Sequence, residues 1–194
     1  MKCDVVIAGV GGHGVVSLGM VLAACGRADG LEVKLSEVHG MAQRGGSVQA
    51  NLRLSDEPIH GALIARASAD VLLGTEPLES LRYVGALAPE GVLLSATDPH
   101  ENIPNYPPIE ELESRLRALP RVVLVEASRL AREAGTAKAA NVVMAGAASL
   151  YLPLSVGALE EQIRKAFASK GEGVVESNLT AFHKGREAAQ CFES

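Results

Sequence analysis

A glycine cluster between two apolar segments is the feature that most constrains the fold of this chain. Residues 4–8 are apolar after an initial aspartate, residues 15–25 are almost wholly apolar, and the glycines lie between them. This order predicts a buried strand, a tight turn and a buried helix. The turn fits G-x-G-x-x-G, which lets a backbone approach an anion at a helix N-terminus. We therefore expect an anion-proximal loop at Gly9, Gly11, Gly12 and Gly14.

Further apolar runs predict the rest of a sheet. Buried strands are expected over residues 31–35, 69–74, 91–96 and 121–125, with helical segments between them. Residues 47–54 instead alternate apolar and polar side chains at period two, which is typical of a half-exposed strand, and we place this strand at an antiparallel edge. The expected fold class is α/β: a Rossmann-like, doubly wound, mostly parallel sheet with an antiparallel edge strand and a C-terminal helical tail.

Length and hydropathy favour one domain over residues 1–194. The uncharged stretch 139–159 is long enough to cross a membrane, but Pro153 divides it and much of it is alanine, so we expect a buried helix and a turn instead. After Pro153 the chain is predicted to be helical, with Ser155 as a helix cap. No membrane association is expected.

Composition and residue spacing narrow the classes of function. The net charge of −5 and the lack of a basic stripe argue against a nucleic-acid partner. Three cysteines, at positions 3, 25 and 191, are too far apart for a zinc site or an iron–sulfur cluster, and the histidines lack metal-ligand spacing, so we expect no metal. The odd cysteine count and the lack of a signal peptide indicate a cytoplasmic protein. No serine lies in a nucleophile motif, and we expect no catalytic residue on this chain.

A polar loop over residues 37–46 is unusual for a dinucleotide-binding protein. Glu37 lies 23 residues after Gly14, a loose match to the ribose-binding acid expected roughly 20 residues on. The loop then gathers imidazole, amide and guanidinium donors beside two glycines, a set suited to an anionic group. Its members are His39, Gln43, Arg44, Gly45 and Gly46. The alternative interpretation is a solvated turn whose glycines serve conformation alone.

Two motifs together resemble a known family. They are Gly9-Val-Gly-Gly-His-Gly14 and Ser36-Glu-Val-His-Gly-Met-Ala-Gln-Arg-Gly-Gly-Ser47. Both closely resemble the small (beta) subunit of indolepyruvate:ferredoxin oxidoreductases, which is of the gamma type within the 2-oxoacid:ferredoxin oxidoreductase superfamily. Residues 73–79, 141–146 and 170–179 are also similar, so the resemblance spans essentially the whole chain. His13 stands where members of this family usually have glutamine.

The resemblance implies the small subunit of a complex that converts an aryl pyruvate, coenzyme A and oxidised ferredoxin into an aryl acetyl-CoA, CO2 and reduced ferredoxin. Thiamine diphosphate, Mg and iron–sulfur clusters are expected on a large partner subunit, with no cofactor bound by this chain alone. Arg44, Gly45 and Gly46 would bind a substrate carboxylate or a coenzyme A phosphate, supported by His39 and Gln43. Ferredoxin would be reached through the complex.

Several alternatives remain open at this point. Within the family, the substrate can be pyruvate, 2-oxoglutarate or phenylglyoxylate in place of indolepyruvate. In a different class, the chain would be a stand-alone nicotinamide- or nucleotide-binding module, an interpretation that does not explain the Arg-Gly-Gly loop. A homodimer of the chain isolated from its partner is a further alternative.

Overall fold

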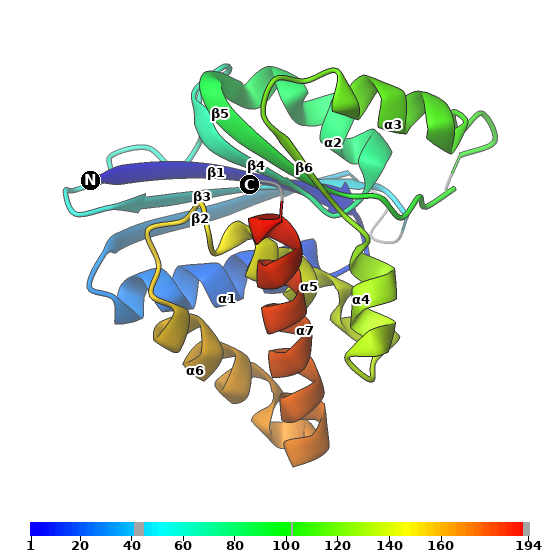
Figure 1. The fold of residues 1–194 in the computed structure, drawn as a ribbon. Helices are drawn as coiled ribbons and strands as arrows, with labels where there is room; N and C mark the ends of the chain where they lie inside the picture. The colour runs from blue at the N-terminus through cyan, green and yellow to red at the C-terminus, as the bar shows by residue number, and fades with distance from the viewer. Residues whose placement is uncertain (41–44, 102, 192–194) are drawn as a thin grey trace.

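A six-stranded sheet forms the centre of the computed structural model, which describes residues 1–40, 45–101 and 103–191 (Figure 1). The strands are β1 (Lys2–Val10), β2 (Glu32–His39), β3 (Ser47–Ser55), β4 (Ala69–Gly74), β5 (Leu87–Ala96) and β6 (Val122–Val125). Their spatial order is β2-β3-β1-β4-β5-β6. β1, β4, β5 and β6 run parallel, whereas β3 is antiparallel to both β1 and β2. The mostly parallel sheet predicted from the apolar runs is confirmed.

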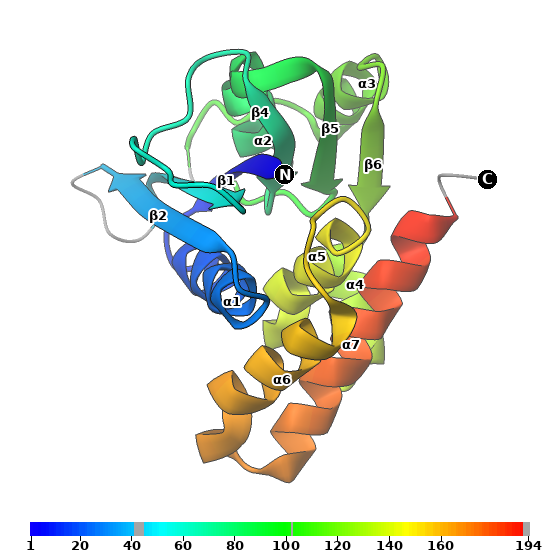
Figure 2. The same cartoon turned by 90° about the vertical axis from the view of Figure 1, so that its left-hand side faces the viewer.

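The antiparallel strand differs from its expected position. β3 lies between β1 and β2, so it is hydrogen-bonded on both sides, and β2 forms the edge of the sheet instead (Figure 2). The period-two alternation arises because only one face of β3 packs on the large apolar core, through side chains such as Leu52 and Leu54. The opposite face carries Gln49, Asn51 and Arg53, two of which bond to the loop over residues 56–68. The placement of residues 47–54 at an edge was therefore wrong, although their antiparallel direction was right.

Helices cover both faces of the sheet, as in a doubly wound fold (Figures 1 and 2). One face carries α2 (Pro77–Tyr83) and α3 (Ile109–Arg117). The other face carries α1 (Val15–Ala28), α4 (Ala127–Glu133), α5 (Ala140–Ala148), α6 (Val156–Phe167) and α7 (Glu172–Gln190). Single 3₁₀ turns lie at Val84–Ala86, Ala137–Ala139 and Ala168–Lys170. The larger apolar core lies on the α1 side, and a smaller core lies beneath α2 and α3.

The C-terminal helices are part of the core. Ser155 begins α6 as predicted, because its Oγ accepts a hydrogen bond of 3.3 Å from the backbone N–H of Ala158. α7 packs along α5 with glycines at the contact, and Phe182 of α7 is fully buried there. The expected helical tail thus forms a second helical layer beneath the sheet (Figure 1).

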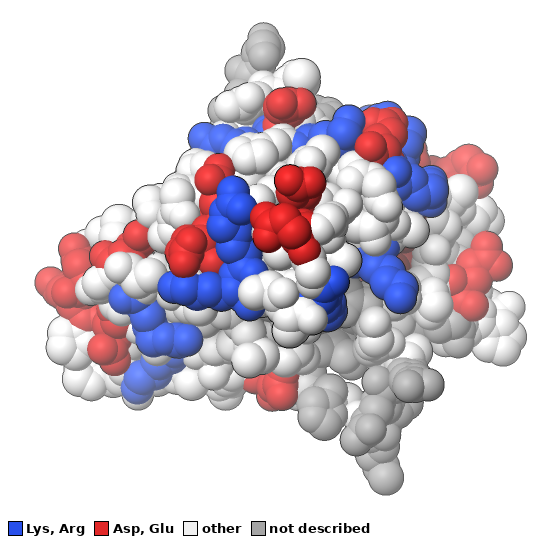
Figure 3. Space-filling view, turned by 90° about the horizontal axis from the view of Figure 1, so that it is seen from below, with Lys and Arg blue, Asp and Glu red and all other residues white. Residues whose placement is uncertain are grey.

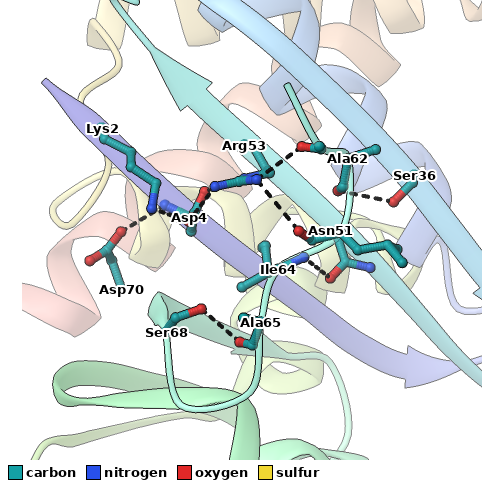
Figure 4. A network of polar contacts seen from close by, with 12 residues as sticks. Lys2, Asp4, Ser36, Asn51, Arg53, Ala62, Ile64, Ala65, Ser68 and Asp70 are labelled. Carbon is teal, nitrogen blue, oxygen red and sulfur yellow. Dashed lines mark hydrogen bonds and ion pairs between the residues drawn. The ribbon is translucent and has the colours of Figure 1, made fainter. Parts of the chain in front are cut away.

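A buried ion-pair network ties the loop over residues 56–68 to the sheet (Figure 4). The carboxylate of Asp4 is 1% exposed and accepts hydrogen bonds from Arg53, with Nε at 2.8 Å and Nη2 at 3.1 Å. Lys2 Nζ lies 2.7 Å from the same carboxylate. Arg53 Nη1 also donates to the carbonyl of Gly61 at 2.9 Å. This network lies at the amino end of β1, opposite the end where the glycine loop begins.

The uncharged stretch is interrupted as expected. α5 ends at Ala148 and α6 begins at Val156, with Pro153 between them. Among the described residues, no helix is both long and apolar enough to cross a membrane.

The surface below the helices carries charges of both signs. Lys and Arg side chains are interspersed with Asp and Glu side chains on this face (Figure 3). Helical neighbours such as Lys165 and Glu161 form ion pairs, at 3.3 Å, and Lys184 of α7 reaches Glu133 of α4 at 3.1 Å. Exposed pairs of this kind contribute little stability individually. The mixed pattern is typical of a solvated face.

Candidate functional site: a crevice at the carboxyl end of the sheet

The glycine loop connects β1 to α1 at the carboxyl end of the parallel strands. Gly12 has φ of +97° and Gly14 has φ of +79°, a left-handed conformation that costs a side chain about 1–2 kcal/mol. A Cβ on Gly9 would lie 2.0 Å from Thr75 Oγ1, and one on Gly14 would lie 2.7 Å from Asn141 Nδ2. The turn therefore needs glycine both for its backbone angles and for the close approach of neighbouring segments.

The glycine loop is joined directly to the end of the polar loop. The backbone N–H of Gly11 donates to the carbonyl of Gly46 at 2.8 Å, and the N–H of Gly45 donates to the carbonyl of Gly11 at 3.1 Å. These two bonds extend the β1–β3 pairing by one step beyond the strands. The two motifs singled out from the sequence thus form one structural unit.

A crevice of about 530 Å³ opens beside this unit. Its walls come from the segments that follow β1, β4, β5 and β6 and from the start of α5, which is where open α/β sheets bind ligands. It is lined by Gly12, His13, Gly14, Thr75, Ala96, Asp98, Pro99, Ala127, Ser128, Ala137, Lys138, Ala140, Asn141 and Met144. α1 and α5 both begin at this crevice, so the positive ends of their helix dipoles lie beside it.

Polar side chains give the crevice a mixed chemistry. Lys138 supplies a cation and Asn141 an amide, while Asp98 accepts a hydrogen bond of 2.9 Å from the backbone N–H of Ser128. Thr75 is fixed to β1, because its N–H donates to the carbonyl of Ala8 at 2.8 Å. The combination of a lysine, an amide and two helix N-termini suits a polar, anionic ligand group.

A histidine pair borders the crevice. The ring of His13 packs edge-on against the ring of His100, with centroids 4.3 Å apart. Burial lowers the pKa of His13, the charge of His100 lowers it further, and Glu76 partly opposes both. His13 is therefore more strongly held in its neutral form than an exposed histidine.

Two buried carboxylates, at the cap and in the first turn of α2, lie outside the crevice lining. Glu76 is 1% exposed and caps α2, since its Oε2 accepts from the N–H of Glu79 at 2.8 Å. Its Oε1 accepts from the N–H of His100 at 3.3 Å and also from the hydroxyl of Tyr106. These contacts place Glu76 at the helix start, and it is not among the residues that line the crevice.

Glu79 is equally buried and reaches a different segment. Its Oε2 accepts a hydrogen bond of 2.5 Å from Ser47 Oγ, and its Oε1 lies 3.4 Å from Arg82 Nε. Tyr83 OH lies 3.1 Å from the same Ser47 hydroxyl. Burial raises the pKa of Glu79, and the Ser47 hydrogen bond and Arg82 oppose that rise.

Not all predicted site residues can be placed. Gln43 and Arg44 lie outside the described residues, and His39 ends β2 with its side chain also outside them. Gly45, with φ of +74°, and Gly46 are described and contact Gly11. The binding roles predicted for these residues stay predictions.

Glu37 does not occupy the position of a ribose-binding acid. It lies on β2 and pairs with Ala50 of β3, so a whole strand separates it from β1 and the glycine loop. In a dinucleotide-binding fold, that acid comes from the strand next to the glycine loop.

The cysteines do not fit an iron–sulfur cluster. Burial raises the pKa of both Cys3 and Cys25 to about 12, with nearby aspartates adding to the rise, which disfavours the thiolate form that binds metal. Cys191 is exposed at the end of α7. In the described ranges, no group of three or more His, Cys, Asp or Glu side chains can hold a metal ion.

Several crevice residues were missed from the sequence. Thr75, Asp98 and Ser128 each come shortly after a strand that was predicted, so the rule that ligands bind at strand carboxyl ends points to them. Lys138 has no such signal, because it lies in a 3₁₀ turn between two helices and does not follow a strand.

Comparison with known proteins agrees with this arrangement. The family described as "Pyruvate ferredoxin/flavodoxin oxidoreductase" matches residues 4–188. The chain is 36% identical to indolepyruvate oxidoreductase subunit IorB of Archaeoglobus fulgidus, over 97% of this chain and 96% of that protein. It is 35% identical to 2-oxoglutarate synthase subunit KorC of Methanothermobacter marburgensis, over 96% of each.

A solved structure shows the same fold in a larger protein. The 2-oxoglutarate:ferredoxin oxidoreductase of Magnetococcus marinus, with 2-oxoglutarate, coenzyme A and succinyl-CoA bound, superimposes with a TM-score of 0.77 at 26% identity. The match covers 98% of this chain but 31% of that one. The fold described here is thus one part of that longer polypeptide.

Proposed function

Because the chain belongs to the pyruvate ferredoxin/flavodoxin oxidoreductase family, we propose that it completes an enzyme that oxidises indolepyruvate. It is a small, gamma-type subunit of a 2-oxoacid:ferredoxin oxidoreductase. The reaction joins the acyl group of the 2-oxoacid to coenzyme A, releases CO2 and a proton, and passes the two electrons to ferredoxin. Four relatives named for indolepyruvate match nearly the whole chain, one of them at 36% identity, which supports the aryl substrate.

One observation carries the role proposed for this chain: Gly11 bonds to both Gly45 and Gly46, so the end of the polar loop is joined to the glycine loop, whose residues 12–14 line the crevice. Arg44, next to Gly45, would then contribute a guanidinium to a substrate carboxylate or a coenzyme A phosphate. Lys138 and the glycine loop, Gly9 to Gly14, would supply the other favourable charge and the close backbone approach. His39 and Gln43 would support the same contact.

The cofactors belong, on this proposal, to a large partner subunit. Thiamine diphosphate with Mg and the iron–sulfur clusters would be held there, and ferredoxin would dock on the assembled complex. The cysteine chemistry described above supports this, because the two buried thiols resist the ionisation that cluster binding requires. The contribution of this chain is to bind and orient a substrate group and to form one wall of the path to it.

The alternatives differ in what favours them. A 2-oxoglutarate substrate is favoured by the KorC relative, which is nearly as similar as the IorB relative. A stand-alone nicotinamide-binding module is disfavoured by the position of Glu37, one strand away from the glycine loop. Cytoplasmic location remains an inference from cysteine usage.

An omission assay tests the proposal directly. The chain is co-expressed with a large subunit of the same family of complexes from the same genome, and viologen reduction is followed with indolepyruvate and coenzyme A, each component being left out in turn. We expect activity only when both chains and both substrates are present, with pyruvate and 2-oxoglutarate giving lower kcat/KM. Tight binding of a nicotinamide nucleotide by the chain alone, without activity in the mixture, would refute the proposal.

Arg44→Ala tests the proposed contact within the active complex. We expect kcat/KM for one of the two substrates to fall, because one charge-assisted hydrogen bond is lost. The fall should correspond to about 1.5–3 kcal/mol of transition-state binding. Arg164→Ala is the matched control, because Arg164 is an exposed arginine in the last turn of α6. Equal kinetics for both variants would remove Arg44 from the site.

A further inference from the structure

The cap and first turn of α2 contact two separate segments, one that leads to the crevice lining and one that leads to the end of the polar loop. Their two buried carboxylates offer four oxygens, of which one, Glu76 Oε2, caps the helix. A second, Glu76 Oε1, accepts from the N–H of His100 and the hydroxyl of Tyr106, in the loop after β5. A third, Glu79 Oε2, accepts from Ser47 Oγ at the start of β3. Capping alone would need only the first of these contacts.

Each segment connects to the glycine loop, which lines the crevice. His100 follows Asp98 and Pro99, which line the crevice, and its ring contacts His13 of the glycine loop. Ser47 follows Gly46, whose carbonyl accepts from the N–H of Gly11. A shift of either segment would therefore be transmitted to the glycine loop, from one side through a ring contact and from the other through a backbone hydrogen bond.

We propose that Glu76 and Glu79 are positioning residues, which hold the loop after β5 and the start of β3 at a fixed separation and thereby set the shape of the crevice. Neither carboxylate lines the crevice, so both act through other residues. The inference rests on the function proposed above, because it assigns to α2 the task of supporting that same site.

The burial of these groups supports a positioning role. Glu76 is 1% and Glu79 2% exposed, and a buried carboxylate is tolerated only where its oxygens are hydrogen-bonded. The hydrogen-bond partners of these carboxylates outside α2 are the hydroxyls of Ser47 and Tyr106 and the backbone N–H of His100. They come from segments distant in sequence, so each contact fixes one element against another. Thr75, directly before Glu76, lines the crevice itself and is bonded to β1. The helix start is thus tied to β1, to the loop after β5 and to the start of β3.

The test removes the far partners and leaves both carboxylates in place. Ser47→Ala deletes the hydroxyl that bonds to Glu79, and Tyr106→Phe deletes the one that bonds to Glu76, so the cap of α2 is kept in both variants. Ser68→Ala is the matched control: it also loses a hydrogen bond, of 2.7 Å to Ala65, but directly before the amino end of β4. The double variant, with both Ser47→Ala and Tyr106→Phe, shows whether the two effects combine.

Two readouts separate a positioning role from simple stability. In the isolated chain, amide exchange by NMR should be faster at Gly45 in Ser47→Ala and at His100 in Tyr106→Phe, by about 3- to 10-fold. In the complex, each variant should raise KM for coenzyme A or the 2-oxoacid by about 3- to 10-fold while kcat stays within about twofold. The double variant should show roughly the product of the two effects. The control should change neither.

The outcomes distinguish this inference from the function proposed above. Unchanged exchange in both variants would overturn the inference, and so would faster exchange with both KM values unchanged. If the wild-type complex shows no coenzyme A-dependent oxidation, the proposed function fails, while faster exchange at Gly45 and His100 would still support the hold of α2 on both segments.

Discussion

Asp4 illustrates, at the scale of a single residue, how burial is balanced by pairing. Burial alone would raise the pKa of this carboxyl, but the hydrogen bonds and charges of Arg53 and Lys2 together outweigh it and lower the pKa below its usual value. A lowered pKa in the folded state means that the ionised form stabilises the fold. That contribution is present above the pKa of the unfolded chain and is lost as pH falls through the lower folded value.

Asp4→Asn should therefore destabilise the chain in a pH-dependent way. At pH 7 we expect the free energy of unfolding to fall by about 3 kcal/mol, the low end of the cost of breaking a buried pair, because Arg53 stays partly exposed to water. The difference from wild type should shrink as pH falls below about 4. Urea denaturation across this range measures it, with exposed Glu57→Gln as the control. A difference that persists undiminished at low pH would contradict the ion-pair explanation.

The candidate site was predictable in part at this scale. The glycine positions follow from backbone geometry, and Gly12 and Gly14 do adopt positive φ angles. The contact between Gly11 and Gly46 was not predictable, since it depends on β3 pairing beside β1. Lys138 was missed because its position is set by how α4 and α5 pack, which no local pattern records.

The bounds of individual helices and strands were predicted more completely than the order of the strands in the sheet. Apolar runs located β4 to the residue and α1 at its first residue, because burial on both sides leaves a continuous apolar signal. The order of the strands in the sheet was harder to predict. The alternation in β3 shows which of its side chains are polar, but not how many strands pair with it. Here β3 lies inside the sheet, and its polar face bonds to a loop.

The contact between α5 and α7 also depends on residues that a pattern search passes over. A Cβ on Gly146 would lie 1.9 Å from the carbonyl oxygen of Phe182, and one on Gly185 would lie 1.9 Å from that of Val143. The two helices thus approach with backbone against backbone, and each glycine faces the other helix. Such a contact tolerates no added methyl group without movement of a helix.

Gly146→Ala and Gly185→Ala should each destabilise the fold. We expect losses of about 1–3 kcal/mol in the free energy of unfolding, even though alanine favours helix formation. Gly157→Ala in α6 is the matched control, because a Cβ there meets nothing within 4 Å, and it should not destabilise. Urea denaturation followed by circular dichroism compares all three. Wild-type stability of Gly185→Ala would show that the helices can separate at no cost.

At the scale of the whole molecule, the chain has its own apolar core and also belongs to a larger assembly. Among the described residues, 48 apolar side chains are buried around one sheet, a core large enough to predict that the chain folds on its own. The same fold accounts for 31% of the Magnetococcus marinus polypeptide, so in that protein it is covalently joined to further parts of the enzyme. Exposed apolar side chains such as Met20, at 60%, and Leu63, at 66%, are available for such contacts.

Thermal unfolding with and without the large subunit tests this view of the assembly. A partner that binds only the folded chain stabilises it by about 2.7 kcal/mol at a hundredfold excess over Kd. For a chain of this length, that corresponds to a rise in Tm of roughly 5–10 °C. The rise should grow with the logarithm of partner concentration, whereas an unrelated protein at equal concentration should leave Tm unchanged. A Tm independent of the large subunit would mean that the two chains do not form a stable complex, and the role of the crevice would then have to be sought in the isolated chain.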